Sequence, residues 1–136
     1  MSLTNVFIDT NLFIYLNTPS ADFDRYAAFY EGEIVDNHAF TSVIVIDELL
    51  YVSKKKYNIP YSTTIEFIDS TVIPCVDILN VDLRTYTTMK EVLKYCSKPS
   101  DALIAATMKN SSVGIILSED GGFDKIPFVQ RKWIYR

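Results

Sequence analysis

Strand-like and helix-like hydrophobic patterns alternate along the first third of the chain. Residues 5–8 end in three consecutive apolar side chains, as in a short buried strand, and apolar spacing predicts a helix over residues 11–16, which Pro19 ends. A further short strand is expected around residues 39–41. Between them, a second helix is expected from Ser20 onward, because four side chains recur at helical spacing: Phe23, Tyr26, Ala27 and Tyr30.

The segment SVIVIDELLYVSKKKY supports two interpretations. The residues that follow Ser42 begin with four β-branched side chains, which favours a strand, whereas Val45, Leu49 and Val52 form a helical stripe. Serine is a preferred residue at a helix N-cap. We therefore expect a helix that begins directly after Ser42.

The middle of the chain predicts one helix and one strand. Thr63 and Glu66 have the spacing of a capping box, which predicts a helix over residues 61–70. The segment TVIPCVDIL is the third strand candidate. Pro74 within it cannot donate a backbone hydrogen bond, which indicates an edge strand.

Two helices follow. Asp82 is the expected N-cap of a helix that runs to about Tyr95, and Pro99 and Ser100 begin an alanine-rich helix that ends at Asn110. The first of these two helices has apolar residues on one face: Leu83, Tyr86, Met89, Val92 and Leu93.

The C-terminal segment predicts the last strands and the fold class. SVGIILS has the pattern of a buried strand, residues 119–122 form a loop, and KWIYR is expected to form a short last strand. Strands that alternate with helices indicate a three-layer α/β/α sandwich with a mostly parallel central sheet. In such sheets, ligands bind beyond the carboxyl ends of the strands.

The composition is that of one globular domain. The chain has 136 residues, 49% of them hydrophobic and 22% charged, which argues against disorder and for a single domain over residues 1–136. The longest apolar runs fall far short of the ~20 residues of a membrane span, and no signal peptide is recognisable, so we expect a cytoplasmic protein. Cys75 and Cys96 lack metal-ligand spacing and are expected to be reduced thiols in the core.

The charges exclude one simple mode of nucleic-acid binding. A net charge of −4 argues against non-specific binding through overall electrostatics, but not against a nuclease that concentrates acids around metal ions. Lys54-Lys55-Lys56 and the row Lys90, Lys94, Lys98 are either solvated helix surface or RNA contacts. His38 has no nucleophile arranged around it, and we expect no catalytic role for it.

Four acids stand at positions that a parallel sheet brings together. Asp9 ends the first strand, Asp120 follows the GIIL strand, and Asp101 lies in the first turn of a helix. Glu48 lies on or beside the apolar stripe of its own helix. A cluster of this kind repels itself unless a cation compensates it. Carboxylate oxygens suit Mg²⁺ or Mn²⁺, and the chemistry we expect is metal-assisted hydrolysis of a phosphodiester.

Four segments resemble the motifs of PIN-domain ribonucleases: FIDTNLFIY, SVIVIDELL, SDALIAATM and ILSEDGGF. They occur in the same order, and the length of the chain is similar to that of VapC-type toxins of toxin–antitoxin pairs. The family's acidic quartet is then carried by Asp9, Glu48, Asp101 and Asp120. Its polar helper falls on Asn11 and its last-motif hydroxyl on Ser118. Asp124 is a candidate accessory acid, Glu119 is an additional acid beside the quartet, and a Gly-Gly pair at 121–122 replaces a more polar loop.

The resemblance implies an activity, a cofactor and partners. The activity is that of an endoribonuclease that requires Mg²⁺ or Mn²⁺, cleaves RNA, is inhibited by a small antitoxin protein and pairs as a homodimer. Asp9, Asp101 and Asp120 would be the principal metal ligands, and Glu48 would complete the site or orient the attacking water. Asn11 and Ser118 would hold carboxylates or a phosphate oxygen by hydrogen bonds.

Each acid taken alone also has a structural interpretation. Asp9 and Asp101 suit helix N-termini for purely structural reasons, and Asp120-Gly121 is a common turn dipeptide. Glu48 and its neighbour Asp47 are equally suited to a solvated helix face. The functional interpretation gains its weight from the four acids together.

Three other functions compete with the nuclease. A phosphotransfer domain is disfavoured because Asn11 stands where a dehalogenase-type phosphatase has its second aspartate, and IILSED lacks the lysine of a receiver domain. A non-catalytic PIN-fold module that binds a partner is disfavoured by the intact quartet. An RNA-processing nuclease without an antitoxin has the same sequence features as a toxin.

Overall fold

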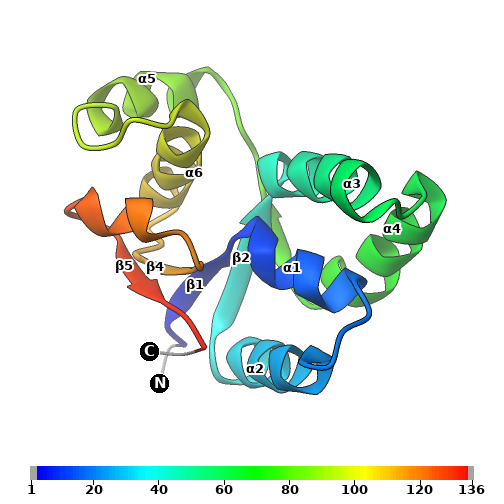
Figure 1. The fold of residues 1–136 in the computed structure, drawn as a ribbon. Coiled ribbons are helices and arrows are strands. Elements are labelled where there is room, and N and C mark those ends of the chain that lie inside the picture. Colours follow the sequence, from blue (N-terminus) through cyan, green and yellow to red (C-terminus); the bar gives the residue numbers. More distant parts are fainter. Residues whose placement is uncertain (1–2, 135–136) are drawn as a thin grey trace.

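The computed structural model describes residues 3–134, in which five parallel strands form one sheet (Figure 1). The strands are β1 (Asn5–Ile8), β2 (His38–Ser42), β3 (Asp77–Leu79), β4 (Ile115–Leu117) and β5 (Gln130–Lys132). Their order in the sheet is β3-β2-β1-β4-β5, so the first strand of the chain lies at the centre.

Helices cover both faces of the sheet. The α-helices are α1 (Thr10–Asn17), α2 (Phe23–Asp36), α3 (Val43–Tyr57), α4 (Tyr61–Phe67), α5 (Leu83–Val92) and α6 (Pro99–Asn110). A π-helical turn, η1 (Ile68–Val72), continues α4, and a 3₁₀ turn, η2 (Gly121–Lys125), follows β4. In Figure 1, α1 to α4 gather on one side of the sheet and α5 and α6 on the other. This confirms the three-layer α/β/α sandwich.

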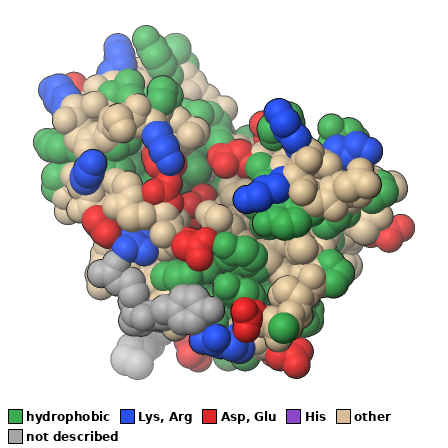
Figure 2. All heavy atoms as spheres, viewed as in Figure 1, with side chains coloured by type: hydrophobic (Ala, Val, Ile, Leu, Met, Phe, Trp, Pro, Cys, Tyr) green, Lys and Arg blue, Asp and Glu red, His purple; other side chains and the backbone are tan. Residues whose placement is uncertain are grey.

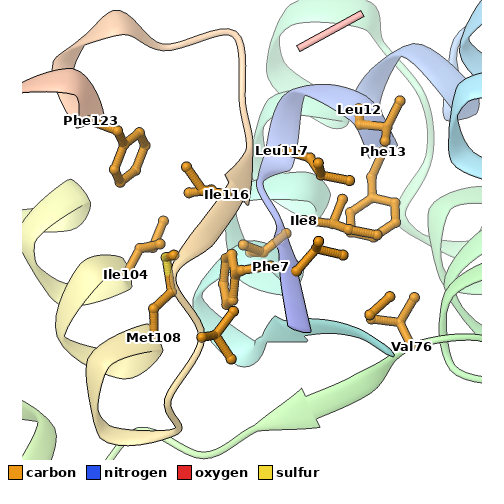
Figure 3. Packing of buried hydrophobic residues seen from close by; sticks show 14 of the residues in the cluster. Phe7, Ile8, Leu12, Phe13, Val76, Ile104, Met108, Ile116, Leu117 and Phe123 are labelled. Carbon is orange, nitrogen blue, oxygen red and sulfur yellow. The ribbon is translucent and has the colours of Figure 1, made fainter. Parts of the chain in front are cut away.

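The core is built on the two central strands. Phe7 pairs with Ile116 and Ile8 with Leu117, so alternate residues of both strands point to opposite faces of the sheet. All four side chains are fully buried. Figure 3 shows what meets them: Ile104, Met108 and Phe123 on one face, Leu12, Phe13 and Val76 on the other. Because both faces are covered, these strands read as continuous apolar runs in the sequence.

The N-cap predictions had mixed outcomes. The helix after Ser42 is confirmed, and the Ser42 hydroxyl accepts a hydrogen bond from the backbone N–H of Ile44. The predicted capping box at Thr63 is wrong, because α4 begins two residues earlier, after Pro60, and has no side-chain cap. A capping box is instead present at Asp82 and Thr85, which begins α5.

Two strand boundaries were predicted wrongly. The first part of TVIPCVDIL is helical, because η1 continues α4 to Val72 and buries that side chain; only the last three residues, 77–79, form a strand. That strand is at the edge of the sheet, as Pro74 indicated. The last strand ends at Lys132, where the KWIYR segment begins, and residues 135–136 of that segment lie outside the described residues.

The burial of two predicted features also differs from expectation. On α5, Val92 is buried, but Leu83, Tyr86 and Leu93 on the same predicted face are exposed. Both cysteines are free thiols as expected, but neither belongs to the fully buried core, since Cys75 is exposed and Cys96 is half-buried. No helix within residues 3–134 is long and apolar enough to cross a membrane.

Candidate active site

Asp9 occupies the junction between the central strand and the first helix. It is the N-cap of α1, and its Oδ1 accepts a 2.8 Å hydrogen bond from the backbone N–H of Thr10. Its other oxygen, Oδ2, accepts a 2.7 Å hydrogen bond from the Ser118 hydroxyl, although the two residues are 109 positions apart. Only 6% of Asp9 is exposed. The carboxylate is therefore a helix cap and also a fixed member of a side-chain cluster.

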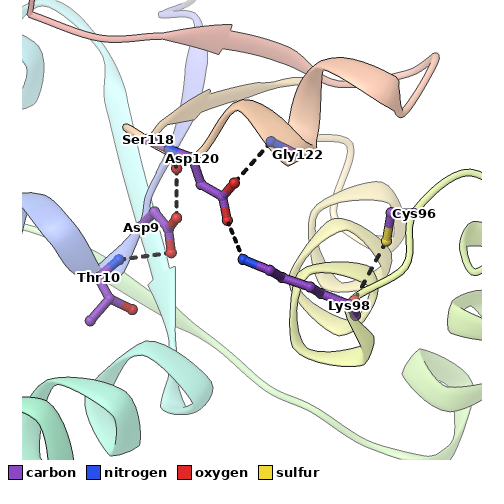
Figure 4. Close-up of polar contacts among 7 residues, drawn as sticks. All are labelled: Asp9, Thr10, Cys96, Lys98, Ser118, Asp120 and Gly122. Carbon is purple, nitrogen blue, oxygen red and sulfur yellow. Dashed lines mark hydrogen bonds and ion pairs between the residues drawn. The ribbon is translucent and has the colours of Figure 1, made fainter.

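The loop after β4 brings Asp120 to the same edge of the sheet (Figure 4). The Ser118 hydroxyl accepts a 3.0 Å hydrogen bond from the backbone N–H of Asp120, while it donates to Asp9. Asp120 is the N-cap of η2, and its Oδ1 accepts a 2.8 Å hydrogen bond from the backbone N–H of Gly122. One serine therefore connects the two acidic segments.

Asp101 approaches the cluster from the first turn of α6. A Cβ atom placed on Gly122 would lie 3.1 Å from Oδ1 of Asp120 and 3.4 Å from Oδ2 of Asp101, so both carboxylates surround this glycine. Lys98, the N-cap residue of α6, reaches Oδ2 of Asp120 at 3.6 Å with a side chain that is 67% exposed (Figure 4). This well-solvated cation compensates the cluster weakly. Arg131 is also close enough to feel the charge of Asp120, but it is bound to Asp124.

Glu48 faces the cluster from α3. It is half-buried and lies two turns into that helix. Burial raises the pKa of Glu48, and the negative charge of Asp9 raises it further, while a hydrogen bond with Thr10 acts in the opposite direction. Asp9 is thus the acid that connects the others: its charge acts on Glu48 and on Asp101, and the charge of Asp120 acts on Asp9.

The pKa values of the three aspartates reflect their burial and the closeness of their negative charges. Burial raises the pKa of Asp9, more than the hydrogen bonds from Ser118 and Thr10 lower it. Burial also raises the pKa of Asp101 to about 7, with further contributions from the charge of Asp120 and the hydrogen bond to it. For Asp120, burial is outweighed by hydrogen bonds from Gly122 and Asp101, and by Lys98, so its pKa is lowered.

The donor set suits a hard divalent cation. Carboxylate oxygens are the ligands that Mg²⁺ and Mn²⁺ prefer. The buried hydroxyl of Thr10 lies beside the carboxyl groups of Asp9 and Glu48 and adds a neutral oxygen to the cluster. Within residues 3–134, no group of three or more His, Cys, Asp or Glu side chains has the geometry of a complete metal site. Magnesium commonly binds through only one or two carboxylates and keeps several of its waters, so it does not require three protein ligands.

The accessory candidates lie around the quartet with different contacts. Asn11 is half-buried in the first turn of α1. Asp124 is held by Arg131, whose Nε and Nη2 each donate a 3.0 Å hydrogen bond to its carboxylate. Arg131 also donates through Nη1 to the backbone carbonyl of Ser118 at 3.3 Å, and so ties η2 and β5 to the serine. Sequence reasoning missed Arg131, because nothing in the local pattern of QRKW distinguishes it from a solvated residue.

A second contact missed from the sequence involves Glu119. The hydroxyl of Tyr15 donates a 2.6 Å hydrogen bond to Oε1 of Glu119, which joins α1 to the loop that carries Asp120. A cue was present in the motif, since Tyr15 falls six residues after Asp9 on the helix that Asp9 caps.

The basic residues and His38 have surface positions. Figure 2 shows acidic side chains gathered in the middle of one face, with Lys and Arg side chains around them. Of the lysine row on α5 and beyond, Lys98 reaches the cluster, while Lys94 pairs with Glu91 at 2.7 Å. His38 begins β2 and contacts the exposed Asp77 at 2.6 Å, which is a contact within the sheet edge.

Comparison with known proteins shows the family to which the chain belongs. The chain matches the PIN domain over residues 6–129. It is also 25% identical over 142 aligned residues to Ribonuclease VapC2 of Methanocaldococcus jannaschii, an alignment that covers 96% of this chain and 94% of that protein.

Solved structures share the fold. VapBC2 from Rickettsia felis, bound to a DNA fragment from its promoter, has a TM-score of 0.72 at 20% identity, with 96% of this chain and 98% of that chain covered. VapC20 from Mycobacterium tuberculosis, described as a toxin that cleaves the sarcin–ricin loop, has a TM-score of 0.71 at 15% identity, with 88% and 92% covered. The sequence match extends over nearly the whole chain and the architecture agrees with it, and this chain therefore belongs to the PIN domain family.

Proposed function

We propose that this protein is a divalent-metal-dependent endoribonuclease and the toxin of a toxin–antitoxin pair, formed by one domain that spans residues 1–136. The observation that carries the proposal is the convergence of Asp9, Glu48, Asp101 and Asp120, from four segments, on one edge of the sheet. The cations near them are an exposed lysine, Lys98, and Arg131, which is bound to Asp124. PIN-domain ribonucleases generally depend on divalent metals. We assign Mg²⁺ or Mn²⁺ to this chain.

The residues of the site have distinct roles in the proposed reaction. A bound divalent cation would neutralise negative charge on the phosphate and would lower the pKa of the attacking water. Asp9, Asp101 and Asp120 would hold it, directly or through water, and Glu48 would accept a proton from the attacking water, for which its raised pKa suits it. Ser118 fixes the Asp9 carboxylate through its 2.7 Å hydrogen bond.

Other residues act on the surroundings of the reaction. Lys98 is free to turn from Asp120 to a phosphate oxygen, because most of its side chain is exposed. Asn11 and Asp124 are proposed as accessory groups, the former toward a phosphate oxygen and the latter by holding Arg131 against the Ser118 carbonyl.

The partners follow from the same relationship. The 25%-identical relative is named a ribonuclease, and similar structures are described as VapBC2 and as FitAB, each bound to a DNA fragment. We infer an RNA substrate, a small antitoxin protein, a homodimer and a cytoplasmic location for this chain.

Cleavage mapping on total RNA tests the proposal. RNA from the source organism is incubated with the wild-type protein and with Asp101→Asn, each with Mn²⁺ or with EDTA, and the new RNA ends are sequenced. We expect discrete cuts that need Mn²⁺ and that disappear in Asp101→Asn. Thermal unfolding of both proteins checks that the variant is folded.

The contrary outcomes separate the alternatives. Absence of cuts with any protein, together with RNA binding, identifies a non-catalytic binding module. Cuts that persist with EDTA or in Asp101→Asn exclude the quartet as the active site. Metal-dependent cuts without an antitoxin gene beside the gene for this chain identify an RNA-processing enzyme.

A further inference from the structure

A hollow lined by tyrosines opens beside the candidate active site. Its volume is about 450 Å³, within the range of small-molecule binding sites. It lies between the C-terminal half of α1, the segment that leads into α2, and the end of α3. The residues that line it are Tyr15, Thr18, Pro19, Ser20, Asp22, Tyr26 and Tyr57.

One wall of the hollow is connected to the carboxylate cluster. Tyr15 is half-buried, and its hydroxyl is bonded to Glu119, the residue before Asp120. Tyr15 lies six residues beyond Asp9 on the same helix, which corresponds to about 9 Å along the helix axis. An RNA strand bound across the carboxylates covers such a distance in about one or two nucleotides.

The walls have the chemistry of a surface for stacking bases. Tyr15 is stacked on Tyr26 with ring centroids 4.5 Å apart, and Tyr26 lies 6.1 Å from the Trp133 ring, so packing holds this wall rigidly. Tyr57 is 37% exposed at the end of α3 and offers an open ring to the hollow. Rigid aromatic rings next to solvent are the feature that single-stranded nucleic-acid sites use to bind bases.

The basic side chains at the end of α3 complement a nucleotide, and the acid that lines the hollow, Asp22, lies 3.9 Å from Arg25. The ammonium group of Lys56 lies 5.7 Å from the centre of the Tyr57 ring, and Lys54 and Lys55 precede it in the last turn of α3. A cation beside an exposed ring provides a phosphate contact next to a stacking contact. In Figure 2 a hydrophobic surface over α1 and α2 lies next to the acidic side chains, so the stacking surface and the carboxylates share one face.

We propose that this hollow is a subsite for one base of the RNA, within a few nucleotides of the cleaved phosphate, and that Tyr57 is its open stacking residue. The proposal rests on the proposed function, since it uses the same RNA strand. It adds a contact to a base of the RNA, whereas the carboxylates would act only at the phosphate, through the metal ion that they hold.

Base removal tests the subsite. A short RNA that contains a mapped cut is prepared in a series, each member lacking one base near the cut, and kcat/KM is measured for the wild type and for Tyr57→Ala. We expect loss of one particular base to lower the wild-type kcat/KM about tenfold. For Tyr57→Ala, kcat/KM on the intact RNA should be lower than the wild-type value by a similar factor. Removing that base should not lower the kcat/KM of this variant any further.

Two controls isolate the ring. Tyr57→Phe keeps the stacking surface and should behave as the wild type. Tyr61→Ala removes a tyrosine of similar exposure, 51%, that lines a different hollow on α3 and α4, and should also leave the pattern of base dependence unchanged. The proposal is overturned if Tyr57→Ala cleaves the intact RNA at the wild-type rate, or if every missing base has the same effect. Either result would indicate that the hollow binds a side chain of a protein partner instead.

A binding measurement makes the two proposals separable. RNA that carries 2-aminopurine at the identified position, or at each position in turn if no cut is found, is titrated with Asp101→Asn. Stacking should quench its fluorescence, and the quenching should disappear in Asp101→Asn with Tyr57→Ala. If the fluorescence is quenched but the wild-type protein does not cleave RNA, the proposed subsite is supported and the proposed nuclease activity is overturned. If the wild-type protein cleaves RNA but no position shows quenching, the nuclease activity is supported and the subsite is overturned.

Discussion

Two carboxylates of this protein are equally buried and have opposite surroundings. Asp9 is 6% exposed and Glu33, on α2, is 7% exposed. Oε2 of Glu33 lies 2.9 Å from the ammonium group of Lys132, a contact that joins α2 to β5. Asp9 receives hydrogen bonds from neutral groups of Thr10 and Ser118, and the charged group that acts on it is the carboxylate of Asp120.

The difference distinguishes a carboxylate that supports the fold from one that awaits a ligand. The charge of Glu33 is compensated within the protein, so its burial serves packing between two elements. The charge of Asp9 is uncompensated, and burial raises its pKa. A buried acid whose neighbours are also acids favours a cation from outside.

The largest expected difference concerns RNA cleavage. Asp9→Asn removes a proposed metal ligand and should lower the cleavage rate on the order of 10³-fold, a typical effect of losing a catalytic group. Glu33→Gln, at the same burial, should cleave at the wild-type rate. Rates on one end-labelled RNA with Mn²⁺ measure both variants. Equal losses in the two variants would mean that Asp9 acts through the fold.

Stability should respond in the opposite way. Lys132→Met leaves Glu33 buried without its cation and should lower the free energy of unfolding by about 1–3 kcal/mol, the cost of an unsatisfied buried polar group. Asp9→Asn relieves repulsion, and its amide still accepts the Thr10 hydrogen bond, so its stability should equal or exceed that of the wild type. Urea unfolding in EDTA measures both. Destabilisation by Asp9→Asn would favour a purely structural cap.

A dependence of stability on pH follows from Asp101. Its pKa is about 7 in the folded protein and its ordinary value is 3.8, so the folded state holds an additional proton between these values. Stability without metal should therefore fall as pH rises from about 4 to about 7. We expect the melting temperature to fall by roughly 5 °C across this range. Asp101→Asn should reduce the slope, and Mn²⁺ should raise the melting temperature most above pH 7. A slope unchanged by Asp101→Asn contradicts this assignment.

The smallest expected effect concerns the glycine pair. In Gly122→Ala the new methyl group would lie 3.1 Å from Asp120 Oδ1, which displaces two carboxylates by a few tenths of an ångström. A displacement of this size should lower the cleavage rate roughly three- to tenfold. Gly121→Ala is the matched control, because its methyl group meets its nearest atom at 3.9 Å. Identical rates for the two variants would show that the position of the carboxylates tolerates this change.

The meeting of Asp9 and Asp120 could be predicted from the sequence for a physical reason. Carboxyl ends of parallel strands share one edge of a sheet, so Asp9 after β1 and Asp120 after β4 meet once the two strands are adjacent. Helix caps are local, and Ser42 was identified from its own neighbourhood. Features that depend on the position of a residue within its own strand or helix could therefore be predicted from the sequence.

Contacts that depend on packing between distant elements were not predictable in the same way. Hydrophobic content alone does not separate a strand from a buried helical turn, and Val72 is buried as part of η1. The exposed face of α5 follows from how α5 packs against α6, which periodicity does not define. The bonds of Arg131 to Asp124 and of Tyr15 to Glu119 join different elements of the fold, and the sequence around each residue does not identify its partner.

The hydrogen bond between Ser118 and Asp9 also has a consequence during protein synthesis. It joins β1 to a residue that the ribosome adds 109 positions later, and β4 must be inserted beside β1 before Asp120 reaches the cluster. A nascent chain that ends before residue 118 has Asp9 and Glu48 but lacks the segment that completes the quartet. A nuclease with this order of assembly stays inactive until that segment has been made, so during that part of translation the messenger RNA that encodes it does not meet a complete active site.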